Sequence, residues 1–349
     1  FQSQVTQAQN SDLKPGDQVT ITNPGLEQQQ EGWEGYFWID NMDDIWIGGY
    51  DGFWFNIYQE IKGVPNGLYL LKVNAFSYLY TNYENGIYTK TSDFDKMQLY
   101  VNNYASTVKD IFDDRINKDI FSNAGNGNDD ASRTSDGYYI PSWNFFSWDA
   151  AFKNGLYQNY VVGVVTDNTL VFGLKCESDE QEVVVRFTDF EVTYLSADTD
   201  LKAYAEGLLA KDMSQEANKN LEAALKAYVQ NTNTDNVNSV LYDFTNAIGK
   251  AENSVRTRQA LTEKRNQLEE LLTKTKWEKA ITEAQTIKKS VDAAVTSANY
   301  TDNDALNDII ALQQSIDRLN YTYLDITLST PGTLGDVVLQ EVENFADVK

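Results

Sequence analysis

Residues 160–176, YVVGVVTDNTLVFGLKC, decide the fold class of this chain. Two runs of apolar and aromatic residues, 160–165 and 169–176, flank the pair Asp167-Asn168. Val, Phe and Tyr favour strands because branched and aromatic side chains pack well on a pleated surface. Asp and Asn favour tight turns because their side chains can bond to the neighbouring backbone. The stretch therefore predicts a β-hairpin.

Two longer runs extend this β pattern. Residues 68–80, LYLLKVNAFSYLY, follow the turn signal Pro65-Asn66-Gly67. In the second half of residues 182–195, Phe190, Val192 and Tyr194 alternate with polar residues. Such alternation gives a strand one apolar face. Several strands of this kind, joined by Gly, Asn and Asp turns, favour a β-sandwich or barrel.

The composition changes near Ala197. Six of the seven tryptophans lie before this residue, whereas Ala, Leu, Lys and Glu dominate after it. We therefore expect a multi-domain fold, an all-β sandwich followed by an all-α helical bundle. The expected divisions are a flexible N-terminal segment, the sandwich, a bundle of three to four helices, and a tail that begins a following domain, at residues 1–16, 17–197, 198–320 and 321–349.

The second part contains several amphipathic stretches with helix-capping residues. Asp198 or Thr199, Ser214 and Thr234-Asp235 can each begin a helix, and the third can extend to residue 272. Residues 277–298 form another stretch, and Thr301 with Asp304 forms a capping-box-like start for the last one. The tail predicts a strand at residues 321–329, a turn, and a short helix at residues 333–342.

The charge balance is strongly acidic. The chain has 28 Lys and Arg residues against 52 Asp and Glu residues, a formal net charge of -24. Such a chain repels phosphate backbones and anionic membrane surfaces, so nucleic acid is excluded as an expected partner. No run of about 18 apolar residues predicts a transmembrane helix. Residues 1–12, rich in Gln, Ser and Asn, are typical of a flexible tether at a trimmed N-terminus.

Histidine is absent from the sequence. Its absence excludes Ser-His-Asp and Cys-His catalysis and zinc sites built on histidine. The single cysteine, Cys176, cannot form an internal disulfide, and its apolar surroundings predict a buried structural residue. Carboxylate chemistry and oxygen-ligated calcium remain. Because no motif singles out a catalytic pair of carboxylates, we expect no enzymatic activity.

Two stretches mix aromatic with polar residues, as sugar-binding sites do. They are residues 33–54 and 138–148. Trp33 and Trp54 lie next to strand-like runs, so we expect them in the core. Four aromatic residues beside Gly, Asn and Ser are expected in exposed loops, namely Trp46, Tyr50, Trp143 and Trp148. Together with Tyr139 and Asn144, they are the expected ligand-binding residues. The alternative is that these aromatics only fill a sandwich core.

An ordered set of short phrases marks the first part of the chain. NPGLE at residues 23–27 is followed by Gly32-Trp33, YQEI at 58–61, VPNGLY at 64–69, GLY at 155–157 and FTDFEV at 187–192. Over about residues 17–196, this order resembles the galactose-binding-like jelly roll of carbohydrate-binding modules. More closely, it resembles the N-terminal sandwich of Bacteroidetes surface proteins. The phrase STPGTL at residues 329–334 resembles the entry into the leucine-rich repeats of those proteins.

The resemblance carries expectations about location, ligand and metal. It implies a secreted, lipid-anchored protein on the outer surface of the cell, in contact with glycans. In these jelly rolls a structural Ca²⁺ often links an early corner to an Asp on the last strand, and the matching positions are Glu27 and Asp189. Leu26 stands where the family usually has an aromatic residue. Oxygen ligands of this kind suit calcium.

Three functions remain open at this point. The first is non-catalytic glycan binding or adhesion, with sugar held on loop aromatics of the sandwich. The second is a structural spacer or protein-adhesion module that presents a downstream repeat domain. The third is a carboxylate-dependent glycoside hydrolase, which needs two facing acidic residues in a cleft.

Overall fold

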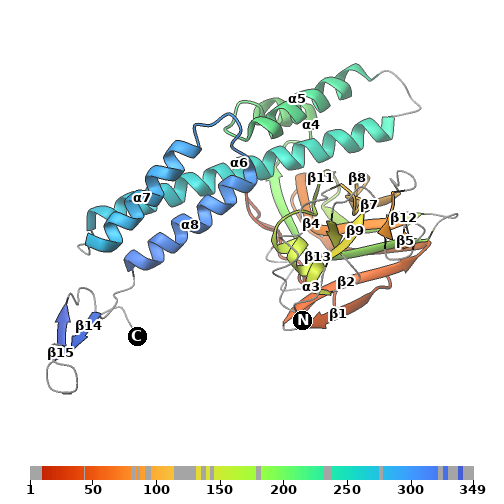
Figure 1. The fold of residues 1–349 in the computed structure, drawn as a ribbon. Coiled ribbons are helices and arrows are strands. Elements are labelled where there is room, and N and C mark those ends of the chain that lie inside the picture. The colour runs from red at the N-terminus through yellow and green to blue at the C-terminus, as the bar shows by residue number, and fades with distance from the viewer. Residues whose placement is uncertain are drawn as a thin grey trace. The chain divides into compact units, whose positions relative to one another are not determined.

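The computed structural model in Figure 1 combines β-sheets with helices. It describes residues 10–42, 44–79, 83–84, 87–90, 96–113, 131–134, 139–141, 145–177, 182–231, 237–274, 278–320, 325–328 and 337–340. The expected mixed, multi-domain organisation of β-structure followed by helices is confirmed. Trp143 and Asn144, two of the expected ligand-binding residues, lie outside the described residues.

Two antiparallel sheets form the β part. The five-stranded sheet has the order β1 (Trp38–Met42), β2 (Ile45–Gly52), β13 (Val183–Ser196), β4 (Gly67–Leu79) and β11 (Gln158–Val165). The four-stranded sheet has the order β3 (Trp54–Lys62), β12 (Thr169–Glu177), β7 (Met97–Val101) and β8 (Tyr104–Thr107). The hairpin expected at residues 160–176 is therefore split, because β11 and β12 belong to different sheets. Its turn crosses from one layer to the other.

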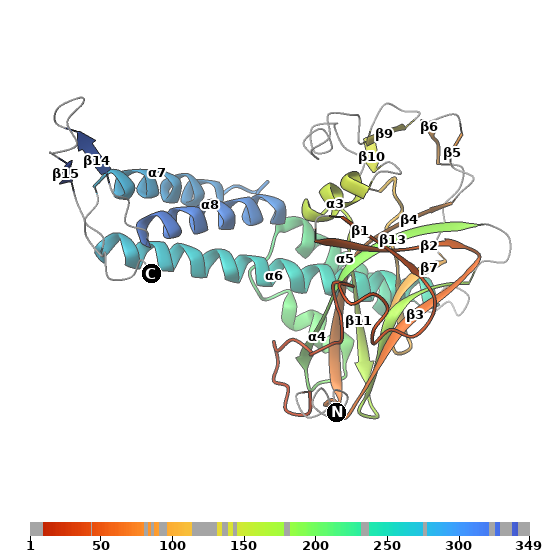
Figure 2. The ribbon, with the colours of Figure 1, turned by 90° about the horizontal axis from the view of Figure 1, so that it is seen from below.

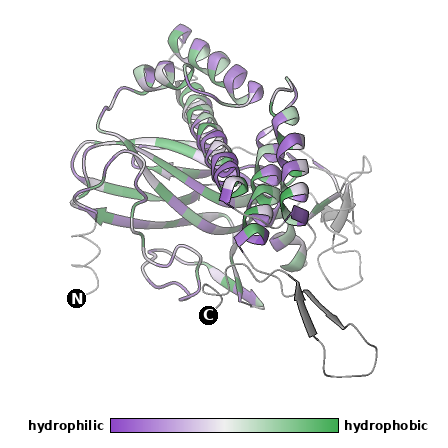
Figure 3. Ribbon diagram, turned by 90° about the vertical axis from the view of Figure 1, so that its left-hand side faces the viewer, coloured by the Kyte–Doolittle hydropathy of each residue, from purple (hydrophilic) through white to green (hydrophobic). Residues whose placement is uncertain are grey.

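A single apolar core lies between these two sheets. Along β3, Phe55, Ile57 and Ile61 are buried and alternate with outward residues, as the pleat of a strand requires. Alternating apolar and polar colours along the strands are visible in Figure 3. The same core takes in residues of β4, β7, β11, β12 and β13, among them Leu71, Leu99, Val161, Phe172, Cys176 and Phe187. The predicted burial of Cys176 is confirmed.

The outer face of the five-stranded sheet carries a second apolar cluster. Helix α3 (Phe145–Lys153) contributes Phe145, Trp148 and Phe152 to it, and the sheet contributes Ile47 and Phe76. Four short strands form a separate sheet in the order β10 (Tyr139–Pro141), β9 (Ala131–Thr134), β6 (Ile87–Tyr88) and β5 (Tyr83–Glu84), with β6 parallel to β9. The five-stranded sheet is thus covered on both faces.

Five helices are described between residues 201 and 320, where three to four were expected. They are α4 (Leu201–Leu208), α5 (Gln215–Gln230), α6 (Val237–Lys274), α7 (Glu278–Ala294) and α8 (Asp302–Asn320). None of the described helices combines the length and apolarity that a membrane crossing needs. In the tail, β14 (Asp325–Leu328) pairs with β15 (Val337–Gln340). The helix expected at residues 333–342 is therefore wrong at 337–340, where strand pairing overrides a short amphipathic pattern.

The chain divides into two compact units that do not follow the composition change at residue 197. Unit 1 consists of Phe1–Ala210 and Asn220–Lys250, and unit 2 consists of Lys211–Lys219 and Ala251–Lys349. The first part of α6 therefore belongs with the sandwich. A composition change marks a change of secondary structure, whereas a unit is defined by packing, and the two need not coincide.

Within unit 1, the start of α6 lies against strands β8 and β11, and Figure 2 shows α6 passing beside β11. The Thr245 hydroxyl donates to the carbonyl of Ala105 at 3.2 Å, and the Asn246 amide donates to Ser106 Oγ at 2.9 Å. At Gly249, an added Cβ would lie 2.5 Å from Cβ of Tyr160, so the helix backbone approaches β11 as closely as a residue without a side chain allows. These contacts fix the part of α6 that belongs to unit 1 on the sandwich.

Unit 2 is a helical bundle with its own apolar core. The core residues include Leu261 and Leu268 of α6, Ala284 and Val291 of α7, and Leu312 and Ile316 of α8. One buried serine of α6 joins the beginnings of two other helices. The Ser254 hydroxyl donates to Asp302 Oδ1 at 2.6 Å, and the Ser214 hydroxyl donates to Asp302 Oδ2 at 2.9 Å. Since Ser214 precedes α5 and Asp302 begins α8, this network fixes both helix starts.

Two helical glycines give a matched test of this packing. We expect Gly249→Ala to lower the free energy of unfolding by about 1–3 kcal/mol, because the new methyl group overlaps Tyr160. Gly207→Ala in α4 is the control, since an added Cβ there has no atom within 4 Å, and we expect a gain of about 0.5–1 kcal/mol. Urea unfolding followed by tryptophan fluorescence measures both, and equal effects of the two changes would contradict the close approach of α6.

Candidate functional site

The outward face of the four-stranded sheet carries rows of side chains set by strand register. Lys175 of β12 lies opposite Asn56 of β3 on one side and Gln98 of β7 on the other. Gln98 in turn lies opposite Thr107 of β8. Directly opposed residues of antiparallel strands project to the same face. The register therefore places an amide, an ammonium, an amide and a hydroxyl side by side across the sheet.

The next row is aromatic, with a glycine at its centre. Gly173 lies opposite both Tyr58 of β3 and Tyr100 of β7. A Cβ at Gly173 would lie 1.9 Å from the carbonyl oxygen of Ile57, so only glycine fits this position. Without a side chain there, no group separates the two tyrosines along the row. The Tyr100 hydroxyl donates to Asn56 Oδ1 at 2.9 Å, and Lys175 Nζ lies 5.4 Å from the Tyr100 ring centroid.

Burial of the Tyr100 phenol raises its pKa to about 12, and neighbouring Tyr58 adds to the increase. The phenol is therefore neutral and keeps its proton at physiological pH. A neutral phenol bonded to Asn56 is held in a fixed orientation. The polar row and the aromatic row thus form one connected surface.

An exposed tryptophan lies at one end of this outward face, at the start of β3. Trp54 lies opposite Glu177, two residues before Asn56, and is 59% exposed. The expectation that Trp54 is a core residue is therefore wrong, because the pleat of β3 turns Phe55 inward and Trp54 outward. Tyr36, 70% exposed, belongs to a segment that runs along the edge of β3, where Glu34 pairs with Tyr58. Two exposed rings therefore flank the polar row.

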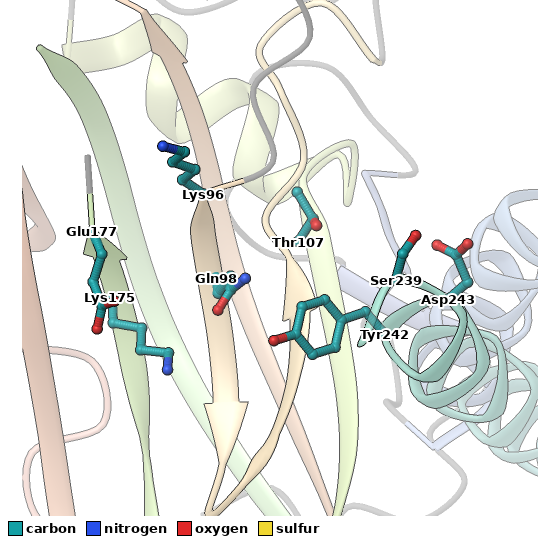
Figure 4. A pocket seen from close by; sticks show the side chains of 8 residues that line it. All are labelled: Lys96, Gln98, Thr107, Lys175, Glu177, Ser239, Tyr242 and Asp243. Atoms are coloured by element: carbon teal, nitrogen blue, oxygen red, sulfur yellow. The ribbon is translucent and has the colours of Figure 1, made fainter. Parts of the chain in front are cut away.

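Helix α6 forms a wall beside this sheet, and the result is a groove of about 500 Å³. Figure 4 shows Tyr242 projecting from α6 toward Gln98, with Ser239 and Asp243 beside it. The groove is also lined by Lys96, Thr107, Lys175 and Glu177. Partial removal from water raises the pKa of the Asp243 carboxyl above its ordinary value, although the positive charge of Lys250 opposes this increase. The groove thus offers both hydrogen-bond donors and carboxylate acceptors.

The predicted ligand residues of the first aromatic stretch pack toward the inter-sheet core. Trp46 and Tyr50 lie on β2 rather than in a loop, and both are half-buried against the core between the sheets. The Tyr50 ring lies 4.9 Å from the Phe55 ring, and the carbonyl of Trp46 accepts a bond from Thr188. The expectation that they are exposed in loops is therefore wrong, whereas their role in ligand binding stays a prediction.

The second aromatic stretch lies on the opposite face of the five-stranded sheet. Trp148 is on helix α3 and only 5% exposed, and Tyr139 is half-buried against the same cluster. The expected exposure of Trp148 is wrong, because Trp148 and Trp38 enclose the guanidinium of Arg186, at 4.8 and 4.4 Å from their ring centroids. Arg186 also donates to Asp51 at 2.7 Å. The two predicted stretches therefore do not form one site.

The predicted calcium residues lie near one corner of the sandwich. The backbone N–H of Phe190 donates to the carbonyl of Pro24, so the turn that holds Glu27 lies against β13 beside Asp189. Asp189 Oδ2 accepts from the Asn74 amide at 2.9 Å. Among the described residues, no three His, Cys, Asp or Glu side chains lie close enough to share a metal ion. Because calcium takes six to eight oxygen ligands, this pair does not by itself fit the ion, and the site stays a prediction.

Sequence reasoning missed the groove because its residues are distributed over three strands and a helix. Alternation in WFNIYQEIK, residues 54–62, is the one local signal that separates Trp54, Asn56 and Tyr58 from the core. The corresponding pattern in β12 is obscured by Val171 and Gly173, which are outward but not polar. No local pattern relates Tyr242 to this sheet.

Comparison with known proteins does not assign the chain to a family. No protein-family model matches it, and no curated protein is detectably similar to it in sequence.

Burial separates the structural tryptophan from the exposed one in a way that mutagenesis can test. We expect Trp148→Ala to reduce the free energy of unfolding by about 3–5 kcal/mol, because it removes a buried ring and uncovers Arg186. Trp54→Ala is expected to change it by no more than about 0.5 kcal/mol, because that ring is mostly in solvent. Urea unfolding of both variants measures these changes. A large loss of unfolding free energy in Trp54→Ala would contradict the outward position of that residue.

Proposed function

We propose that this protein is a non-catalytic glycan-binding protein that holds sugar in the groove on the outer face of its four-stranded sheet. The observation that carries the proposal is the register of β3, β12 and β7. This register places Trp54 and the tyrosine row next to the polar row, which consists of Asn56, Lys175 and Gln98. Sugars present apolar C–H faces and hydroxyl groups together. A site for them therefore needs aromatic surface next to donors and acceptors.

The residue types of the groove match this requirement. Tyr242 provides aromatic surface in the groove, and exposed Trp54 provides more beside it, opposite the lining residue Glu177. Amphipathic rings are favoured where one part of a contact is apolar and another part is solvated. Gln98 can both donate and accept, Lys175 donates, and Glu177 accepts. The groove is open and polar rather than a closed apolar cavity, which suits a hydrophilic ligand. We place the sugar here rather than on the loop aromatics expected from the sequence.

The proposal extends to fold family and location. Two antiparallel sheets of five and four strands around one core are consistent with a jelly roll of the galactose-binding-like kind. The resemblance to Bacteroidetes surface proteins supports a secreted protein at the cell surface. The spacer function is compatible with the same fold, but no contact in the groove favours it.

A carboxylate-dependent hydrolase is the second candidate, favoured by one observation. Glu177 and Asp243 both line the groove, and the pKa of Asp243 is raised by its protein surroundings. A glycosidase uses one carboxyl with a raised pKa as the acid and a second, ionised carboxylate. The test is whether the protein releases new reducing ends when it is incubated with a glycan. If it does, and if both Glu177→Gln and Asp243→Asn abolish the release, the function is hydrolysis and not binding alone.

A glycan-array screen of the full chain tests the proposal, with calcium and with a chelator. We expect Trp54→Ala and Lys175→Gln each to weaken binding of any glycan found by about tenfold, since ring stacking and a charged hydrogen bond each contribute roughly 1–2 kcal/mol. Ile310→Ala, an exposed apolar change on α8, is the control and should bind as the unmodified chain does. Binding that survives both groove changes, or no binding to any glycan, would overturn the proposal.

A further inference from the structure

Unit 2 contains a cleft of its own, which shares no lining residue with the groove of unit 1. It has a volume of about 370 Å³ and is lined by residues 211–213, Gln215 and Asn218 around the start of α5, by Arg258 of α6, and by Val295, Ser297, Ala298 and Tyr300 between α7 and α8. All of these residues belong to unit 2. The Ser214–Ser254–Asp302 network joins the helix starts next to this cleft. The cleft is therefore built from fixed elements rather than from a loose surface.

Arg258 is the unusual residue of this cleft. It is only 8% exposed, and its Nε atom is buried without a hydrogen-bond partner. Its guanidinium donates from Nη2 to the carbonyl of Tyr300 at 3.1 Å and lies 4.6 Å from the centroid of the Tyr300 ring. Neither partner carries a negative charge. No ion pair joins Arg258 to a carboxylate within the described residues.

Two acids close to Tyr300 bond to other groups. Asp304 accepts from the backbone N–H and the hydroxyl of Thr301, and these bonds, with a smaller effect of the Arg258 charge, lower the pKa of Asp304. Asp308 accepts from the Tyr300 hydroxyl. A buried cation normally has a bonded counter-charge, because removal of an ion from water is costly. Arg258 has no such bonded partner.

The other groups around the cleft are suited to an anion. Among the lining residues, Lys211 adds a second positive charge and Asp212 is the one carboxylate, while the Asp302 carboxylate next to the cleft is bonded to Ser214 and Ser254. The start of α5, a helix of 16 residues, faces the cleft through Met213, Gln215 and Asn218. The first N–H groups of a helix lack partners inside the helix and carry partial positive charge. Helix start and buried guanidinium together form a recurrent arrangement for oxyanions.

We infer that this cleft is a binding site for an oxyanion group, a carboxylate, sulfate or phosphate carried by a small ligand, with Arg258 as its principal contact. Val295, Ala298 and Met213 provide apolar wall for the remainder of the ligand. The inference does not rest on the proposed sugar groove, since the two sites share no residue. In a chain with a net charge of -24, a cleft of this kind selects an anion by local contacts and not by the overall field.

Calorimetric titration and thermal unfolding of the full chain test the inference. The probes are sodium phosphate, sodium sulfate and sodium glucuronate, each compared with sodium chloride at equal ionic strength, because salt alone screens the acidic surface. We expect at least one oxyanion to bind and to raise the unfolding temperature above that in chloride. We expect Arg258→Gln to weaken that binding by about tenfold or more, since a hydrogen bond between two charged groups is stronger than one from a neutral amide.

Two further variants keep the test decisive. Lys211→Gln changes an exposed residue of the cleft and should weaken binding even if Arg258→Gln fails to fold, whereas Lys226→Gln, exposed on α5 outside the cleft, should leave binding unchanged. A preference for glucuronate identifies a carboxylate ligand, and a preference for phosphate or sulfate identifies a tetrahedral one. Equal unfolding temperatures in all four salts, or binding unaffected by both cleft variants, would overturn the inference and leave Arg258 as a support of the turn before α8.

Discussion

The pleat of strand β12 is the constraint on which the sandwich and its groove both depend. Leu170, Phe172, Leu174 and Cys176 face the inter-sheet core, so Val171, Gly173, Lys175 and Glu177 must face outward. The neighbouring strands β3 and β7 follow the same alternation because their register is fixed by pairing with β12. A slip of one residue would expose the core and bury Lys175 at the same time. Fold stability and surface chemistry are therefore set by one register.

Gly173 connects this constraint to the groove. Its missing side chain lets the backbone of β3 approach, as the 1.9 Å separation between an added Cβ and the Ile57 carbonyl oxygen indicates. It also leaves Tyr58 and Tyr100 in one row with no side chain between them. The same close packing recurs at Gly249, where α6 meets Tyr160. Two glycines thus decide how near the elements that surround the groove can come.

Among the described residues, two buried arginines, Arg186 and Arg258, illustrate opposite solutions to one physical problem. Arg186 is enclosed between Trp38 and Trp148 and bonded to Asp51, so its charge has both an aromatic and an anionic partner. Arg258 has an aromatic partner and a carbonyl but no bonded carboxylate. Because an unpaired buried charge is costly, Asp51 offsets the charge of Arg186, whereas Arg258 would gain from an anionic ligand. The same residue type therefore supports packing in unit 1 and ligand binding in unit 2.

The sequence by itself determined the element types and much of the core. Alternation and turn residues located β4, β11, β12 and β13, and capping residues with apolar periodicity located α4 to α8, because these signals are local. Only the tertiary structure decided which aromatics are exposed. Trp148 lies in a stretch rich in polar residues, yet helix α3 packs it against the five-stranded sheet, whereas Trp54 begins strand β3 and faces solvent. The groove, with Tyr242 beside Gln98, and the cleft around Arg258 depend on contacts between residues distant in sequence, and no local pattern encodes those distances.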